Sequence, residues 1–220
     1  MSLWSEFLSN QQRPIHKWTH YFPIYERHFG HLRNQAIKFL EIGCGQGGSL
    51  QMWKRWLGPR AIIAGIDKRA ACGAFEEDQI YVRIGDQSDP AFLGKLIEEF
   101  GAFDAILDDG SHNMSDVSAS FEGLYSTMSN CGIYMIEDMH TAYLPEYGGG
   151  LKIEGSFMER AKSLVDHLNA ERSRGQVEPD RFSRETWSIH FYECVIVFER
   201  GRRVPTQPRM TGTKSNATSS

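Results

Sequence analysis

The sequence predicts an α/β protein built on a doubly wound, mostly parallel sheet of seven strands that ends in an antiparallel hairpin. Three observations support this fold class. Short apolar runs alternate with amphipathic helical patterns along most of the chain, which is the arrangement of successive βαβ units. A glycine-rich turn follows the first apolar run. The last β-rich stretch leaves room only for a tight reversal near Tyr192–Cys194, so its two halves should pair as a hairpin.

Each strand is expected at an apolar run, and each helix at an amphipathic stretch between runs. The expected strands are 37–43, 61–67, 79–86, 103–109 and 131–138, with the hairpin at 187–200. The expected helices are 48–58, 89–101, 113–129 and 156–172. Asp89 or Ser88 is expected to cap the second of these helices, with Pro90 in its first turn, because a side-chain oxygen and a proline are typical of that position.

The two ends of the chain differ from this sheet-forming middle, residues 37–200. Residues 1–36 are helical in pattern and rich in aromatic side chains. We expect this segment to cover a cofactor site and to contact a neighbouring subunit in a homo-oligomer, because a free arm would expose too much apolar surface. Residues 201–220 have the composition of a disordered tail.

The composition excludes several classes of protein. The 220 residues suit one domain, and 40% hydrophobic with 24% charged residues is ordinary for a globular chain. A net charge of −4 without a basic run argues against a nucleic-acid partner. The cysteines are few and widely spaced, which indicates reduced thiols. No signal peptide and no membrane-spanning run is visible, so we expect a cytoplasmic protein with no membrane partner.

The glycine-rich turn "EIGCGQGG" follows the first expected strand and opens a helix, as in Rossmann-like folds. Its glycine spacing alone is also compatible with a dinucleotide site or a tight turn. Glu41 precedes the turn, and an acid there favours a cationic ligand group, such as an α-amino group or a sulfonium, over a pyrophosphate. Asp67 ends the second strand, where it is placed to accept hydrogen bonds from ribose hydroxyls. Asp86 and Gln87 end the third strand and are placed to meet an adenine edge.

Two acids end each of the fourth and fifth expected strands. Asp108 and Asp109 begin the motif "DDGSH", and Glu137 and Asp138 begin "EDMH". Neighbouring parallel strands end on the same edge of a sheet, so these carboxylates should gather there and repel one another. A hard divalent cation such as Mg²⁺, Ca²⁺ or Mn²⁺ would relieve this repulsion. Helix capping and pairing with basic residues are the alternatives, although capping explains one acid per strand and not two.

These motifs together resemble class I S-adenosylmethionine-dependent methyltransferases. "EIGCGQGGS", "GID" and "GDQSD" occur in that order at three successive strand ends, and the resemblance implies a methyltransferase domain over 37–200. It also implies that the donor lies over the glycine turn, with "KWTHYFPIYERHF" folded above it. The implied donor-binding residues are Lys17, Tyr21, Glu41, Gly43, Gly45, Gly47, Ser49, Asp67, Lys68, Asp86, Gln87 and Asp108.

The segments "ILDDGSH" and "IEDMHTAYLPEYGGG" narrow the resemblance. They look like those of the metal-dependent macrolide-sugar O-methyltransferases and the related cephalosporin hydroxylase–rhamnosyl O-methyltransferase group. This resemblance implies Asp109, Glu137 and Asp138 as ligands of Mg²⁺ or another hard divalent cation. It also implies His112 as the general base, because an imidazole near neutrality accepts a proton readily. His140 is left as a partner of the site or a substrate contact.

The sequence therefore predicts an O-methyltransferase that uses S-adenosyl-L-methionine and a divalent metal. Its acceptor would be a hydroxyl of a sugar or of a glycosylated natural product, or of another polyol. A catechol-type O-methyltransferase acting on an aromatic diol and a non-catalytic nucleoside-binding module are the alternatives. A nicotinamide-dependent oxidoreductase is disfavoured by Glu41 and by the two acid pairs.

Overall fold

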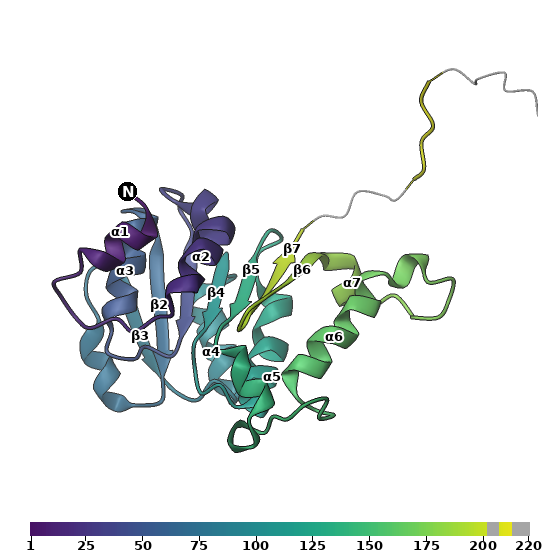
Figure 1. Ribbon diagram of the computed structural model, residues 1–220. Helices are drawn as coiled ribbons and strands as arrows, with labels where there is room; N and C mark the ends of the chain where they lie inside the picture. Colours follow the sequence, from purple (N-terminus) through teal and green to yellow (C-terminus); the bar gives the residue numbers. More distant parts are fainter. Residues whose placement is uncertain (202–206, 213–220) are drawn as a thin grey trace, which may run out of the picture.

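The computed structural model describes residues 1–201 and 207–212, and its centre is a seven-stranded sheet (Figure 1). The strand order is β3-β2-β1-β4-β5-β7-β6. Strands β1 to β5 are parallel to one another, whereas β7 is antiparallel to both β5 and β6. The strands are β1 (Lys38–Ile42), β2 (Ile62–Asp67), β3 (Ile80–Ile84), β4 (Ala105–Asp108), β5 (Ile133–Ile136), β6 (Thr186–Tyr192) and β7 (Val195–Arg200). The predicted fold class is confirmed.

Helices cover both faces of the sheet, because alternate strand residues point to opposite sides. In β5, Ile133 and Met135 pack in the core shared with α1, α2 and α3, whereas Tyr134 and Ile136 pack with α4, α5 and α6 (Figure 1). The helices are α1 (Leu3–Leu8), α2 (Phe22–Phe29), α3 (Gly48–Leu57), α4 (Pro90–Phe100), α5 (Met114–Leu124), α6 (Phe157–Leu168) and α7 (Arg181–Glu185). Short 3₁₀ turns include η1 (Thr19–Tyr21) and η5 (Met139–Tyr143).

Local chemistry explains the boundaries of two elements. The Asp89 side chain accepts a hydrogen bond from the Ala91 N–H at the start of α4, and Pro90 is the first residue of this helix, as predicted. The hairpin between β6 and β7 reverses over two residues, and Cys194 adopts a φ of 60° in the turn. The expected tight reversal is therefore confirmed.

The two ends of the chain follow the expected division only in part. The N-terminal segment is helical and lies against one face of the sheet, where Phe22, Tyr25 and Phe29 of α2 enter the core (Figure 1). The predicted disordered tail, 201–220, falls largely outside the described residues.

All four cysteines are free, as their spacing indicated. Within the described ranges, none of the helices combines the length and apolarity that crossing a bilayer requires.

The topology places the carboxyl ends of β1 to β5 on one edge of the sheet. The order reverses between β1 and β4, because β2 and β3 continue on one side and β5 on the other. A crevice outside the strand ends at such a switch point is where open α/β sheets bind ligands. Both predicted motifs, the glycine turn and the acid pairs, follow strands at this position.

Candidate active site

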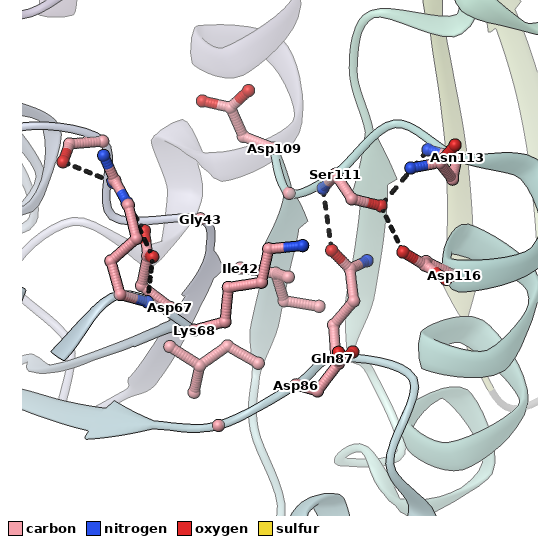
Figure 2. Close-up of a pocket in the computed structure, with 15 residues that line it drawn as sticks. Ile42, Gly43, Asp67, Lys68, Asp86, Gln87, Asp109, Ser111, Asn113 and Asp116 are labelled. Atoms are coloured by element: carbon pink, nitrogen blue, oxygen red, sulfur yellow. Dashed lines mark hydrogen bonds and ion pairs between the residues drawn. The ribbon is translucent and has the colours of Figure 1, made fainter. Parts of the chain in front are cut away.

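A cavity of about 360 Å³ opens at this switch point (Figure 2), a size within the usual range of small-molecule sites. The end of β1, the ends of β2 and β3, and the loop after β4 form its walls. Its lining residues are Ile42, Gly43, Gly45, Ile66, Asp67, Lys68, Arg69, Gly85, Asp86, Gln87, Asp109, Gly110, Ser111, Asn113 and Asp116. In Figure 2 the Lys68 side chain extends from the end of β2 into the middle of the cavity. Half of the residues predicted to bind the methyl donor therefore line one cavity.

The glycine turn needs glycine for two physical reasons. Gly43 and Gly47 adopt φ values of 88° and 79°, which residues with a side chain rarely adopt. A Cβ atom on Gly43 would also lie 2.1 Å from the Asp109 carbonyl oxygen, and one on Gly47 would meet the Phe75 ring at 2.7 Å. The turn therefore lets the backbone approach the cavity and the neighbouring loop closely, as its motif predicted.

Asp67 is held at the cavity wall as an ionised acceptor. Partial burial opposes ionisation, but bonds from the Arg69 side chain and from the N–H groups of Arg69 and Cys44 lower the pKa of Asp67 to about 2. Arg69 also donates to the Gly45 carbonyl oxygen at 2.7 Å. Arg69, which no sequence motif marked, thus pairs with the carboxylate that is predicted to meet a ribose.

The Gln87 side chain belongs to the wall of the cavity and also to the loop after β4. Its Oε1 accepts from the Ser111 N–H at 2.8 Å, and its Nε2 lies 3.2 Å from Asp108 Oδ1. Asp108 is almost fully buried and also accepts from the hydroxyls of Ser120 and Tyr134, at 2.6 and 3.1 Å. Burial raises the pKa of Asp108, although these bonds oppose the shift. The structure thus places Asp108 beneath the loop, outside the cavity lining.

The second acid pair meets the first across the edge of the sheet, with a lysine between them. Lys17 Nζ lies 2.5 Å from Asp109 Oδ2, 2.7 Å from Glu137 Oε1 and 3.6 Å from Glu41 Oε1. Burial alone would lower the pKa of Lys17, but the three carboxylates raise it well above its ordinary value. The Tyr25 hydroxyl donates to the other oxygen of Glu137. The N-terminal segment therefore supplies a cation and a hydroxyl to the predicted metal ligands.

His112 faces the two more exposed acids. Its Nε2 lies 3.5 Å from Asp138 Oδ2 and 3.7 Å from Asp109 Oδ1. His112 and Asp138 adopt φ values of 60° and 56°, a left-handed conformation that is uncommon for residues with a side chain but that His and Asp adopt more readily than most. The Thr141 hydroxyl donates to the His112 carbonyl oxygen at 3.2 Å and so ties the two loops together.

The positions of the acids and of His112 can be compared with the needs of a divalent cation. In the described part of the chain, one ligand atom each of Asp109, His112 and Asp138 lie within 4.8 Å of one another. Carboxylate oxygens are the donors that hard cations prefer. Glu137 adjoins this group, since it shares Lys17 Nζ with Asp109. The carboxylate oxygens therefore fit Mg²⁺ or Mn²⁺. Of the three predicted ligands, Asp109 and Asp138 belong to this group and Glu137 lies next to it.

Other predicted donor residues lie beneath or beside the cavity. Glu41 is fully buried, accepts from the Ser49 hydroxyl at 2.7 Å and from Trp53 Nε1 at 3.3 Å, and its pKa is raised by burial. The Tyr21 hydroxyl donates to Asp138 Oδ1 at 2.6 Å. The predicted donor residues that do not line the cavity are Lys17, Tyr21, Glu41, Gly47, Ser49 and Asp108. Contact of these residues with a donor remains a prediction.

This chain is similar in sequence to known O-methyltransferases. It is 36% identical over 197 residues to the 8-demethyl-8-(2-methoxy-α-L-rhamnosyl)-tetracenomycin-C 3′-O-methyltransferase of Streptomyces olivaceus, covering 84% of this chain and 50% of that protein. It is 36% identical over 213 residues to the mycinamicin VI 2″-O-methyltransferase of Micromonospora griseorubida, covering 90% and 52%. This chain is a homologue of these sugar O-methyltransferases. No protein-family model matches it.

A solved structure of this group has the same fold. MycE methyltransferase from the mycinamycin biosynthetic pathway, in complex with Mg, SAH and mycinamycin VI, aligns with a TM-score of 0.79 at 35% identity, covering 91% of this chain and 53% of that chain. The class I methyltransferase fold and the resemblance to macrolide-sugar O-methyltransferases are therefore confirmed. This chain spans about half the length of the curated relatives that it matches.

Proposed function

We propose that this chain transfers a methyl group from S-adenosyl-L-methionine to a hydroxyl of a glycosylated natural product, with a divalent cation as cofactor. One observation carries the proposal: Asp109 lines the cavity beneath the glycine turn and also belongs to the cluster with His112 and Asp138. A donor in the cavity and a hydroxyl at the cluster would therefore be neighbours. The relatives with Mg and SAH in their structures support both cofactors.

The donor would be held mainly by backbone and by the strand-end acids. The turn at Gly43 and Gly45 brings backbone close to the cavity, and Asp67 presents an ionised carboxylate there. Asp67 would accept hydrogen bonds from the ribose hydroxyls. These bonds would replace some of those that Arg69 donates to Asp67. Asp86 and Gln87 line the same cavity and would meet the adenine of a donor that spans three strand ends.

The hydroxyl of the acceptor would be prepared at the acid cluster. Asp109, Glu137 and Asp138 would hold the cation, which supplies Lewis-acid stabilisation of the negative charge that develops on the hydroxyl oxygen. His112 would take the hydroxyl proton on Nε2, the atom that faces Asp109 and Asp138. The two carboxylates would then stabilise the imidazolium. Fixing both partners on one rigid sheet edge lowers the entropic part of the barrier.

Calorimetry tests the donor assignment without knowledge of the acceptor. The protein with Mg²⁺ should bind S-adenosylmethionine and its demethylated product but not NAD⁺, and a hundredfold excess over Kd should add about 2.7 kcal/mol to the stability of the folded state. Asp67→Ala should weaken donor binding, whereas Glu98→Ala, at an exposed acid of α4, should not. Binding of NAD⁺ in place of the methyl donor would overturn the proposal. The homo-oligomer stays a prediction.

A further inference from the structure

Trp18 is an exposed tryptophan on an otherwise anchored segment. Its residue exposure is 53%, although its neighbour Lys17 is buried among the acids and Tyr21 bonds to Asp138. Its backbone carbonyl also accepts from the Tyr21 N–H at 3.1 Å, which begins η1. A large aromatic side chain is thus kept in solvent by a backbone that the acid cluster itself fixes.

Contacts lead from this indole to the acid cluster. The Trp18 and His140 rings meet edge to face, with centroids 6.2 Å apart and planes at 75°. His140 Nδ1 in turn lies 3.9 Å from Asp138 Oδ1, and the other oxygen of Asp138 faces His112. Only the His140 ring therefore links Trp18, in these contacts, to the carboxylate that, with His112, would receive the acceptor hydroxyl.

The other strongly exposed tryptophan provides a contrast. Trp187 is 55% exposed on the edge strand β6, at the end of the sheet, and it is outside both the cavity lining and the acid cluster. Isolated exposed apolar residues of this kind are normal on a protein surface. Exposure alone therefore does not indicate a binding role for Trp18. Its contact with His140, which adjoins Asp138, does indicate one.

We propose that the Trp18 indole is a stacking surface for the sugar ring of the acceptor, an inference that rests on the proposed function. A pyranoside presents C–H groups on a ring face and hydroxyls around its rim. A face packed on Trp18 leaves a vicinal hydroxyl pair directed along the ring edge, toward Asp138 and His112. A 6-deoxyhexoside suits this surface best, because its methyl group adds apolar area and removes one hydroxyl that stacking would desolvate.

The test uses methyl α-L-rhamnopyranoside as the probe, with the full chain, Mg²⁺ and the demethylated donor product present. Nuclear magnetic resonance of ¹⁵N-labelled indole N–H groups follows each tryptophan, with signals assigned through Trp18→Phe and Trp187→Phe. The Trp18 signal should shift saturably as the rhamnoside is added, and the Trp187 signal should not move. Trp18→Ala should raise the rhamnoside Kd about three- to tenfold, the range of one aromatic contact. Trp18→Phe should restore most of the affinity.

The outcomes separate this inference from the proposed function. Trp187→Ala is the matched control and should leave the rhamnoside Kd unchanged, and Trp18→Ala should keep the donor Kd and the melting temperature of the parent protein. If the donor binds but the rhamnoside fails to shift the Trp18 signal, or binds equally well to Trp18→Ala, the stacking surface is wrong and the methyltransferase proposal stands. If the donor itself does not bind, the proposed function has failed.

Discussion

The carboxyl ends of β4 and β5 both carry two acids in a row, but the two pairs are held in different ways. In each pair the first acid is buried and the second faces the rim: Asp108 and Glu137 are at most 3% exposed, whereas the side chains of Asp109 and Asp138 are 22% and 20% exposed. Asp108 is bonded by hydroxyls and an amide of the sheet domain. Glu137 is bonded by Lys17 and Tyr25 of the N-terminal segment.

This difference shows how the covering segment is joined to the site. The hydrogen bonding of Asp108 at the end of β4 is complete without residues 1–36, since Gln87, Ser120 and Tyr134 supply its partners. The pairing of Glu137 at the end of β5 depends on the N-terminal segment, because this buried carboxylate would be strongly unfavourable without the Lys17 ammonium. Any step that ordered or released the N-terminal segment would therefore change the surroundings of Glu137 and Asp109 before it affected Asp108.

The largest effect is expected from removal of the Lys17 ammonium group, which the buried acids share. Lys17→Met would leave Glu41 and Glu137 buried without it, and should lower the free energy of unfolding by about 3–5 kcal/mol. Urea denaturation at pH 7 measures this loss. Lys95→Met, at an exposed lysine of α4, is the matched control and should change stability by less than about 0.5 kcal/mol. A loss equally small for Lys17→Met would show that the N-terminal segment does not neutralise the buried acids.

A smaller effect is expected at a carboxylate away from the rim. Glu199 on β7 accepts from His28 at 2.8 Å, from Ser188 and from His190, and these bonds lower its pKa to about 2. A depressed pKa in the folded state stabilises the fold above the ordinary value near 4.5, and this contribution is lost as the pH falls toward 2.

Glu199→Gln should therefore cost about 1–2 kcal/mol at pH 6, where the carboxylate is ionised. Urea denaturation of both proteins across pH 6 to pH 2.5 should show the difference shrinking with acid. A difference that stays constant over this range would mean that ionisation of Glu199 does not contribute to stability. This test involves none of the predicted metal ligands, so it separates ordinary carboxylate pairing from the behaviour of the rim.

Much of this arrangement was predictable from local sequence. Short apolar runs predicted the strands, and the glycines of "EIGCGQGG" and the acids at the strand ends marked the cavity edge, because each of these signals is contained within a few consecutive residues. The division into inner and outer acids was not predictable. Asp108 and Asp109 are chemically alike, and Ser120 and Tyr134, which distinguish them, are distant in sequence. The insertion of Lys17 among the acids depends likewise on tertiary packing, which no local pattern records.

The two acids of the β4 end divide the work at the rim: Asp109, with Glu137 and Asp138, would hold the cation beside His112, whereas Asp108 supports the loop beneath it. Calorimetric titration with Mn²⁺ tests this most directly on Asp109→Asn, Asp138→Asn and the matched inner variant Asp108→Asn. The two outer variants should bind Mn²⁺ about tenfold or more weakly, since each removes a charged oxygen ligand. Asp108→Asn should bind Mn²⁺ within about twofold of the parent protein, because the Asp108 oxygens are already engaged by Gln87, Ser120 and Tyr134 and do not belong to the ligand group. Equal losses in all three variants, or unchanged Mn²⁺ binding in both outer variants, would show that Asp109 and Asp138 do not hold the cation.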